Sequence, residues 1–301
     1  MAKDMIVVLG PTASGKTGLG VALATAHGGE VISADSRQVY RGLDIGAGKD
    51  LEEYRVEGVE VPYHLIDVVD LDDEFSVFEY QRRFYEVLGD LRDRGMLPVV
   101  VGGTGLYLEA VLSGYRMVDV PEDRELREEL SGESNESLAE RLRELRPGQH
   151  NTTDLLERGR IVRAIEIALY SQTHDADPAP AMSPLILGIR WERSALHERI
   201  GRRLRARLDG GLVEEVEGLL ARGVAPERLR KLGLEYRFVQ DYLEGVIKNR
   251  NDLFQKLNPA IRNFAKRQET WFRRMERNGA RIRWVAGEAI EEAFEIVASV
   301  L

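Results

Sequence analysis

The sequence contains no cysteine among its 301 residues, which excludes disulfides, thiolate zinc sites and a cysteine nucleophile. No apolar run approaches the roughly 20 residues that cross a bilayer. No signal-peptide pattern precedes the first apolar segment at Met5, so we expect a cytoplasmic protein that binds no membrane. Basic residues are outnumbered by acidic ones, 42 against 51. The net charge of −9 argues mildly against a nucleic-acid partner unless the basic residues are unevenly distributed.

A glycine-rich segment near the start carries the most specific motif. Residues 10–17 read GPTASGKT, the pattern of a P-loop, between an expected strand at Met5–Leu9 and an expected helix at Lys16–Ala26. In that setting backbone N–H groups converge on phosphate oxygens, Lys16 adds a positive charge and the Thr17 hydroxyl can hold Mg²⁺. An ordinary glycine-rich turn is the alternative, and the Lys-Thr pair argues against it. We therefore predict a di- or triphosphate site formed by Gly10, Thr12, Ala13, Ser14, Gly15, Lys16 and Thr17.

Short apolar runs alternate with helical patterns, which predicts an α/β protein whose P-loop NTPase-like parallel sheet is flanked by helices. We expect residues 1–114 to form the first part of this core and residues 115–157 to form a small helical insert. Residues 158–192 are expected to return to the core, and residues 193–301 to form a helical C-terminal region that completes it. The expected strands are Met5–Leu9, Glu30–Ala34, His64–Ile66, Leu97–Val101, Leu185–Trp191 and Arg281–Val285.

The acid that would activate water for NTP hydrolysis is missing from its usual place. The strand at 98–101 ends in Gly-Gly-Thr rather than in an acid, and the apolar run before Asp67 is too short. This favours group transfer over hydrolysis. Asp35 ends a strand that we expect to lie next to the P-loop strand, at the carboxyl edge where such sheets bind ligands. It can act as a general base or cap the following turn, and both interpretations stay open.

Six segments in this order resemble the tRNA dimethylallyltransferase (tRNA isopentenyltransferase) family, from residue 6 to residue 285. They are GPTASGKT (10–17), ADSRQVYRGLDIGAGK (34–49), VPYHLID (61–67), VGGTGLYLEAVL (101–112), GRIVRAIEI (159–167) and AKRQETWFRR (265–274). The resemblance implies transfer of a dimethylallyl group from dimethylallyl diphosphate to the N6 amine of the adenosine 3′ of the anticodon, with release of diphosphate. It implies Mg²⁺ as cofactor and the tRNA anticodon stem-loop as partner, and we expect a monomer.

The resemblance also implies roles for single residues. Asp35 would take a proton from the adenine amine, Thr104 would hold the base or the diphosphate, and Arg203 would bind the diphosphate. The insert would face tRNA. The tRNA-binding positions that it implies are Asp35, Ser36, Gln38, Arg127, Arg160, Arg163, Lys266, Arg267 and Arg273. We interpret His64 as structural and the three tryptophans, Trp191, Trp271 and Trp284, as core residues.

A helical wheel of the long C-terminal helical segment separates two faces. A basic stripe, Arg262, Lys266, Arg273 and Arg277, lies opposite apolar residues. Over residues 261–283, eight basic residues oppose two acidic ones, a local charge of +6. A solvated face is the alternative, but such faces usually mix signs. We interpret the basic stripe as a surface that contacts phosphates.

Three segments depart from the family pattern. The usual DIGTAKP reads DIGAGKD at residues 44–50, which keeps Lys49 but changes the local turn. The usual His-Pro-Asn-Asp run reads HNTTD at residues 150–154, and an expected Gly-Tyr pair reads Glu235-Tyr236. The last two lie in segments that approach tRNA in the family.

Three other functions therefore stay open. The first is an isopentenyltransferase that acts on free AMP, ADP or ATP, and the basic stripe argues against it because a mononucleotide needs no long cationic track. The second is a small-molecule P-loop kinase. The third is a non-catalytic RNA-binding protein, which the intact set of Lys16, Thr17, Asp35 and Thr104 disfavours.

Overall fold

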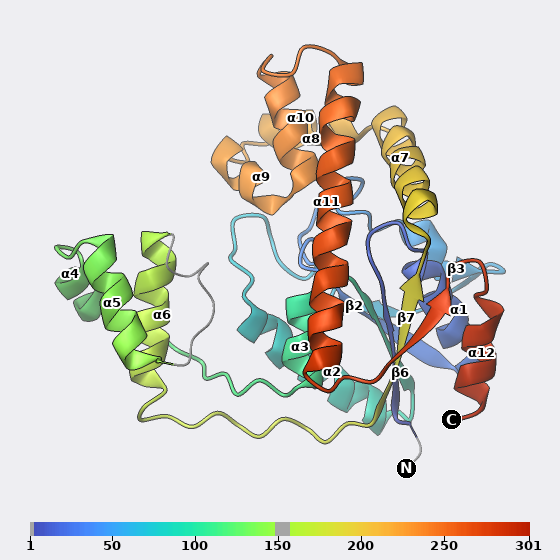
Figure 1. Cartoon of the computed structure of the whole chain (residues 1–301), viewed down its shortest axis with the longest axis horizontal. Helices are drawn as coiled ribbons and strands as arrows, with labels where there is room; N and C mark the ends of the chain where they lie inside the picture. Colours follow the sequence, from blue (N-terminus) through green and yellow to red (C-terminus); the bar gives the residue numbers. More distant parts are fainter. Residues whose placement is uncertain (1–2, 148–156) are drawn as a thin grey trace. The chain divides into compact units, whose positions relative to one another are not determined.

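The computed structural model describes residues 3–147 and 157–301 (Figure 1). It forms two compact units: the first combines Met1–Ser113 with Pro180–Leu301, and the second is Gly114–Ala179. The HNTTD departure at residues 150–154 lies outside the described residues. Within the described ranges, no helix combines the length and the apolar character that a membrane span requires.

A six-stranded sheet with the order β5-β2-β6-β1-β7-β8 forms the centre of the first unit. Every neighbouring pair is parallel, as the α/β pattern predicts. The strands are β1 (Met5–Leu9), β2 (Gly29–Ala34), β5 (Tyr63–His64), β6 (Leu97–Gly102), β7 (Pro184–Arg190) and β8 (Ile282–Ala286). A short antiparallel hairpin of β3 (Arg55–Val56) and β4 (Val59–Glu60), preceded by the 3₁₀ turn η1 (Leu51–Tyr54), was not expected from the sequence.

The expectation that β2 lies next to the P-loop strand is wrong, because β6 lies between β2 and β1. Helix α1 (Lys16–His27) connects β1 to β2 across β6, so consecutive strands in sequence are not neighbours in the sheet. Asp35 nevertheless reaches the P-loop. Gly102 at the end of β6 pairs with Leu9 on one side and with Ala34 on the other, so all three strands end at one level.

Apolar layers cover both faces of the sheet. Side chains alternate along a strand, so Ile6 and Val8 pack with α1 and α12 (Glu291–Ala298). Met5, Val7 and Leu9 pack on the opposite face, against α2 (Val77–Asp93), α3 (Gly105–Leu112) and the end of α11 (Arg250–Arg277). Burial on both faces explains why β1 is a continuous apolar run rather than an alternating one.

A helical region packs above the carboxyl edge of the sheet. Its helices are α7 (Arg193–Asp209), α8 (Leu212–Ala221), α9 (Pro226–Leu232), α10 (Leu234–Leu243) and the first half of α11. They share one apolar core, which includes Leu204, Val216, Tyr236 and Leu257. Figure 1 shows α11 running from this cluster down to the sheet. One helix therefore belongs to both layers, and it fixes the helical region to the strand ends.

The second unit contains α4 (Arg124–Leu130), α5 (Asn135–Leu145) and α6 (Arg158–Tyr170) around its own small core, which includes Leu138, Leu142 and Ile165. The structure corrects the expected boundary of the insert. The chain returns to the first unit at Pro180 rather than at residue 158, because the apolar face of α6 packs with α4 and α5.

The DIGAGKD segment at 44–50 is held from both sides. The Glu215 carboxylate of α8 accepts hydrogen bonds from the backbone N–H groups of residues 44–46, at 2.6 to 3.1 Å, and from the Tyr236 hydroxyl at 2.9 Å. The ammonium of Lys49, which is 1% exposed, pairs with Asp44 at 2.7 Å and with Asp67. Asp67 thus anchors a loop instead of serving as a water-activating acid.

Replacing Glu215 with Gln should destabilise the protein by about 1–3 kcal/mol, because the amide offers one acceptor atom where the carboxylate satisfies four donors. Equilibrium urea unfolding measures this. Glu214→Gln is the matched control, since the neighbouring Glu214 carboxylate is exposed and pairs with Arg250 at the surface. We expect the control to stay within about 0.5 kcal/mol of the unchanged protein, and equal losses in both variants would contradict the role of Glu215.

Candidate active site

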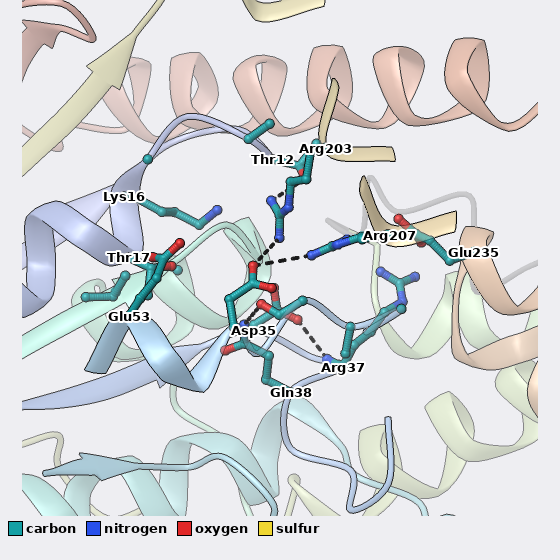
Figure 2. A pocket seen from close by; sticks show the side chains of 18 of the residues that line it. Thr12, Lys16, Thr17, Asp35, Arg37, Gln38, Glu53, Arg203, Arg207 and Glu235 are labelled. Carbon is teal, nitrogen blue, oxygen red and sulfur yellow. Dashed lines mark hydrogen bonds and ion pairs between the residues drawn. The ribbon is translucent and has the colours of Figure 1, made fainter. Parts of the chain in front are cut away.

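A cavity of about 270 Å³ lies at the carboxyl edge of the sheet, between the P-loop, the segment 35–54, α7 and α11 (Figure 2). It is rich in ionisable residues, with six basic and four acidic side chains in its wall. These are Lys16, Arg37, Arg199, Arg202, Arg203, Arg207, Asp35, Asp50, Glu53 and Glu235. The excess of positive charge suits an anionic ligand that carries more than one negative charge.

The P-loop has the conformation that a phosphate cradle needs. Ala13 and Gly15 adopt positive φ angles of 63° and 90°, which turn the loop into the first turn of α1. Three groups from the helical region and the segment before it hold this shape. The Gln268 side chain accepts from the Thr12 N–H at 2.8 Å, Arg199 donates to the Ala13 carbonyl at 2.8 Å, and the Trp191 indole donates to the Ser14 carbonyl at 2.9 Å.

Lys16 and Thr17 begin α1 and line the cavity, as the motif predicts. Burial and the nearby charge of Arg203 lower the pKa of Lys16 to about 8. Glu53 lies on the same side of the cavity in Figure 2, and burial followed by the charge of Asp50 raises the pKa of its carboxyl. The surroundings of Lys16 therefore disfavour its positive charge, and a bound anion would stabilise that charge.

Asp35 follows β2 and Thr104 follows β6, at the same edge of the sheet. One Asp35 oxygen, Oδ1, accepts the Arg37 N–H at 2.9 Å, and the Thr104 hydroxyl accepts the Ser36 N–H at 3.0 Å. The hydrogen bond from Arg37 confirms that Asp35 caps the following turn, and it uses only one of the two carboxylate oxygens. The second oxygen, Oδ2, makes no hydrogen bond within the described chain, so the carboxylate keeps one oxygen for a ligand in the cavity.

Arg203 and Arg207 stand one turn apart on α7 and point into the cavity (Figure 2). Arg203 Nη1 lies 3.5 Å from the Thr12 hydroxyl, which places this guanidinium at the mouth of the P-loop. Burial, followed by repulsion from Arg207, lowers the pKa of Arg203. Gly48 has a φ of 66°, and a Cβ there would overlap both guanidinium groups. The glycine therefore leaves room for the arginine pair.

The predicted tRNA-binding residues of the first unit divide into two groups. Ser36 donates its backbone N–H to the Thr104 hydroxyl, and the amide of Gln38 is engaged within the chain, accepting from Ser33 at 2.7 Å and donating to the Gly48 carbonyl at 2.9 Å. On α11, the side chains of Lys266, Arg267 and Arg273 are exposed. Gln38 thus positions a loop, whereas the α11 side chains are accessible to a large partner.

The second unit contains the other three predicted tRNA-binding arginines. Arg127 and Arg163 both bind the carboxylate of Glu166, at 2.7 and 2.9 Å, and that carboxylate is 1% exposed. Arg160 is exposed and forms a 3.4 Å pair with Glu157. Two of the three guanidinium groups therefore help to hold the three-helix unit together.

The tryptophans pack against the apolar cores but are not fully buried, so the expectation that they are core residues is confirmed only in part. All three are half-buried, and each indole N–H donates to a specific acceptor: Trp191 to the P-loop, Trp271 to Glu109 at 2.8 Å and Trp284 to Glu276 at 2.8 Å. The indole N–H needs a hydrogen-bond acceptor, and this favours a position at the border of the core rather than inside it. His64 is structural as expected, since its ring pairs with buried Glu30 at 2.7 Å.

Several residues that line the cavity were not identified from the sequence, Arg202 among them. Arg207 repeats the four-residue spacing of Arg199 and Arg203, so the helical periodicity could have found it. Arg37 lies within the DSRQ segment that supplied its neighbours. Gln268 and Asp50 likewise lie within the AKRQETWFRR and DIGAGKD segments. Glu53 gave no comparable signal, because only the folded chain brings the segment 50–54 against the P-loop.

The donor set of the cavity fits a magnesium ion bound together with a phosphate. Mg²⁺ is held by one or two protein oxygens while phosphates and water complete its coordination, and Thr17 and Glu53 provide a hydroxyl and a carboxylate on the same wall. In the described ranges, no group of three or more His, Cys, Asp or Glu residues could hold a metal. A protein-only metal site therefore does not account for the carboxylates.

Comparison with known proteins gives a consistent result. The family model described as IPP transferase matches residues 38–275. The chain is 58% identical over 299 residues to tRNA dimethylallyltransferase 1 of Geotalea uraniireducens, covering 99% of this chain and 98% of that protein. It is also 58% identical to tRNA dimethylallyltransferase 2 of Syntrophotalea carbinolica, covering 95% of each.

Solved structures agree with these matches. The tRNA isopentenylpyrophosphate transferase of Bacillus halodurans superposes with a TM-score of 0.70 at 32% identity, over 99% of this chain and 96% of that one. A eukaryotic dimethylallyltransferase acting on tRNA superposes with a TM-score of 0.77 at 22% identity, over 95% of this chain and 74% of that one, which supports the fold. The sequence matches span nearly the whole chain, and this chain belongs to the tRNA dimethylallyltransferase (IPP transferase) family.

Proposed function

We propose that this chain transfers the dimethylallyl group of dimethylallyl diphosphate to the N6 amine of the adenosine 3′ of the anticodon in tRNA. One observation carries the proposal: a P-loop and a carboxylate, Asp35, face one cavity, while the strand between them ends in Gly-Gly-Thr instead of an acid. The cavity can bind a diphosphate and accept a proton without activating water. The proposal includes Mg²⁺ as cofactor and a monomeric enzyme.

The diphosphate end of the donor would lie at the P-loop. Backbone N–H groups at the start of α1, the ammonium of Lys16 and the guanidinium of Arg203 surround that position. Their charge stabilises the negative charge that grows on the departing diphosphate as the bond to the allylic carbon breaks. Magnesium, held by Thr17 and by the diphosphate itself, would neutralise the remaining negative charge of the diphosphate.

The acceptor adenine would enter beside Asp35. Its N6 amine attacks the allylic carbon, a C–N bond forms as the C–O bond to diphosphate breaks, and the amine loses a proton. We assign that proton to Asp35, whose Oδ1 is fixed by the Arg37 N–H while Oδ2 has no partner in the described chain. Thr104, bound to the Ser36 N–H at 3.0 Å, would position the base or the diphosphate. The base must leave its stack to reach this depth.

The assay that tests the proposal offers radiolabelled dimethylallyl diphosphate to unmodified tRNA, AMP and ATP in parallel. Label transfer to tRNA alone supports it. Transfer to AMP or ATP would assign the chain to free-nucleotide prenylation. Phosphoryl transfer from ATP that outpaces prenyl transfer would assign it to the kinases.

Asp35→Asn should reduce the single-turnover rate of prenyl transfer by roughly 10²-fold or more, the usual contribution of a general base. Asparagine keeps the shape and the hydrogen bond from Arg37, so binding of inorganic diphosphate should change far less than the rate does. Asp70→Asn is the control, because the Asp70 side chain is exposed and pairs with Arg41 at the surface. A rate within about threefold of the unchanged enzyme would remove Asp35 from the chemistry.

The KM for dimethylallyl diphosphate should rise as the pH increases through about 8, because Lys16 has its pKa lowered to about 8 by burial and by Arg203. Below that pH the ammonium is charged and binds the diphosphate; above it the free enzyme holds a neutral amine. Lys16→Ala should raise KM at pH 7 and abolish the rise. Lys256→Ala, an exposed change on α11, should retain it. A midpoint near 10, the value of an ordinary lysine, would contradict this reading.

The exposed part of the basic stripe should contribute to tRNA affinity through phosphate contacts. A Lys266→Ala, Arg273→Ala double variant should bind tRNA more weakly, and the slope of log K against log salt should flatten by about 0.7–0.9 per contact removed. The donor KM should not change. Arg82→Ala removes an exposed charge on α2 that is paired with Glu79 and Glu86 and serves as the control. Equal tRNA affinity at two salt concentrations would make the stripe an ordinary solvated face.

A further inference from the structure

Asp50 places a carboxylate among the cations of the cavity. It follows Lys49 in the DIGAGKD segment and adopts a φ of 45° and a ψ of 48° before η1. In this left-handed conformation its Oδ2 lies 3.1 Å from Arg203 Nη2 and 3.5 Å from Arg207 Nη2. A single oxygen therefore contacts two guanidinium groups.

The arginine pair has few other anionic contacts. Arg207 is 12% exposed, and its Nε and Nη2 are buried without a hydrogen-bond partner in the described chain. Arg203 reaches the Thr12 hydroxyl with Nη1 and Asp50 with Nη2. Asp50 is thus the shared counter-ion of two cations that repel each other, and Arg203 connects it to the P-loop.

The same nitrogens are those that a diphosphate at the P-loop would bind. Phosphate oxygens are stronger partners for guanidinium groups than a half-exposed carboxylate, because they are more highly charged and can bind in a bidentate manner. Asp50 is 42% exposed, so its side chain can move into solvent. The carboxylate and a bound diphosphate would otherwise stand as like charges around one arginine pair.

We propose that Asp50 is a displaceable counter-ion of Arg203 and Arg207 that weakens the binding of diphosphate, and so sets donor affinity and assists product release. The inference rests on the proposed function, in which both donor and product carry a diphosphate. Glu235 adds to the effect. It lines the same cavity, interacts electrostatically with Arg203, and makes no hydrogen bond or ion pair within the described chain.

Binding of inorganic diphosphate in the presence of Mg²⁺ tests the inference without tRNA. Asp50→Asn preserves the shape, and asparagine tolerates the left-handed conformation. Isothermal titration of the full chain should show binding roughly five- to tenfold tighter in the variant, the size expected for removing a like charge at ion-pair distance in a half-exposed site. Inhibition of prenyl transfer by diphosphate should strengthen by the same factor.

Glu52→Gln is the matched control, since Glu52 is exposed in the same 3₁₀ turn and does not line the cavity. Its affinity for diphosphate should stay within about twofold of the unchanged protein, as expected for a screened surface charge. Equal or weaker binding of diphosphate by Asp50→Asn would overturn the inference. Equal binding would mean that Asp50 does not affect diphosphate binding, and weaker binding would mean that Asp50 positions the arginines. Thermal unfolding of each variant checks that the fold is retained.

Two further variants locate the effect. In an Arg207→Met background the gain from Asp50→Asn should shrink to about twofold or less, because the contacts are coupled; a full gain would overturn the role of the pair. Lys16→Ala separates this inference from the proposed function. If Lys16→Ala binds diphosphate as tightly as the unchanged protein, the donor site itself is wrong. If it binds more weakly while Asp50→Asn changes nothing, only the inference on Asp50 fails.

Discussion

Three neighbouring strands, β2, β6 and β1, end at one level because Gly102 pairs with both Ala34 and Leu9, and the site depends on that register. Parallel pairing sends all three chains out at the same edge of the sheet. The residues that follow are Asp35, Gly103 and Gly10, which come from three distant parts of the sequence. A shift of one strand by a single residue would turn its apolar side chains to the other face, so the core that fixes the register also fixes the site.

The helical region completes the site rather than merely covering it. Trp191, Arg199 and Gln268 bind the backbone of the P-loop, so contacts from within the chain hold the shape of the loop. The same region supplies the arginine pair of α7. A preformed cradle lowers the cost of binding, and fixed charges around a leaving diphosphate act most strongly where little water remains. The carboxylates of the cavity balance these cations while the donor is absent.

Local patterns predicted the parts of the structure that depend on local chemistry. The P-loop between β1 and α1, the parallel α/β sheet and the accessible side chains of Lys266 and Arg273 all follow from residue types and spacing. Predictions that depended on distant partners were less successful. Insertion of β6 between β1 and β2, the return of the chain at Pro180, and the polar partners of the three tryptophans each depend on how remote segments pack.

The sequence alone determined that this chain has a phosphate-binding loop, a carboxylate after its second long strand and the ordered motifs of its family. Each of these features depends on a few residues that are neighbours in the sequence. Only the tertiary structure decided which charges share the cavity. Asp50 and Arg207 are separated by more than half the chain's length, and their ion pair exists because α7 packs over the loop that contains Gly48. Coulomb interactions depend on the distance between charges in space, and the number of residues between two charges in the sequence does not give that distance.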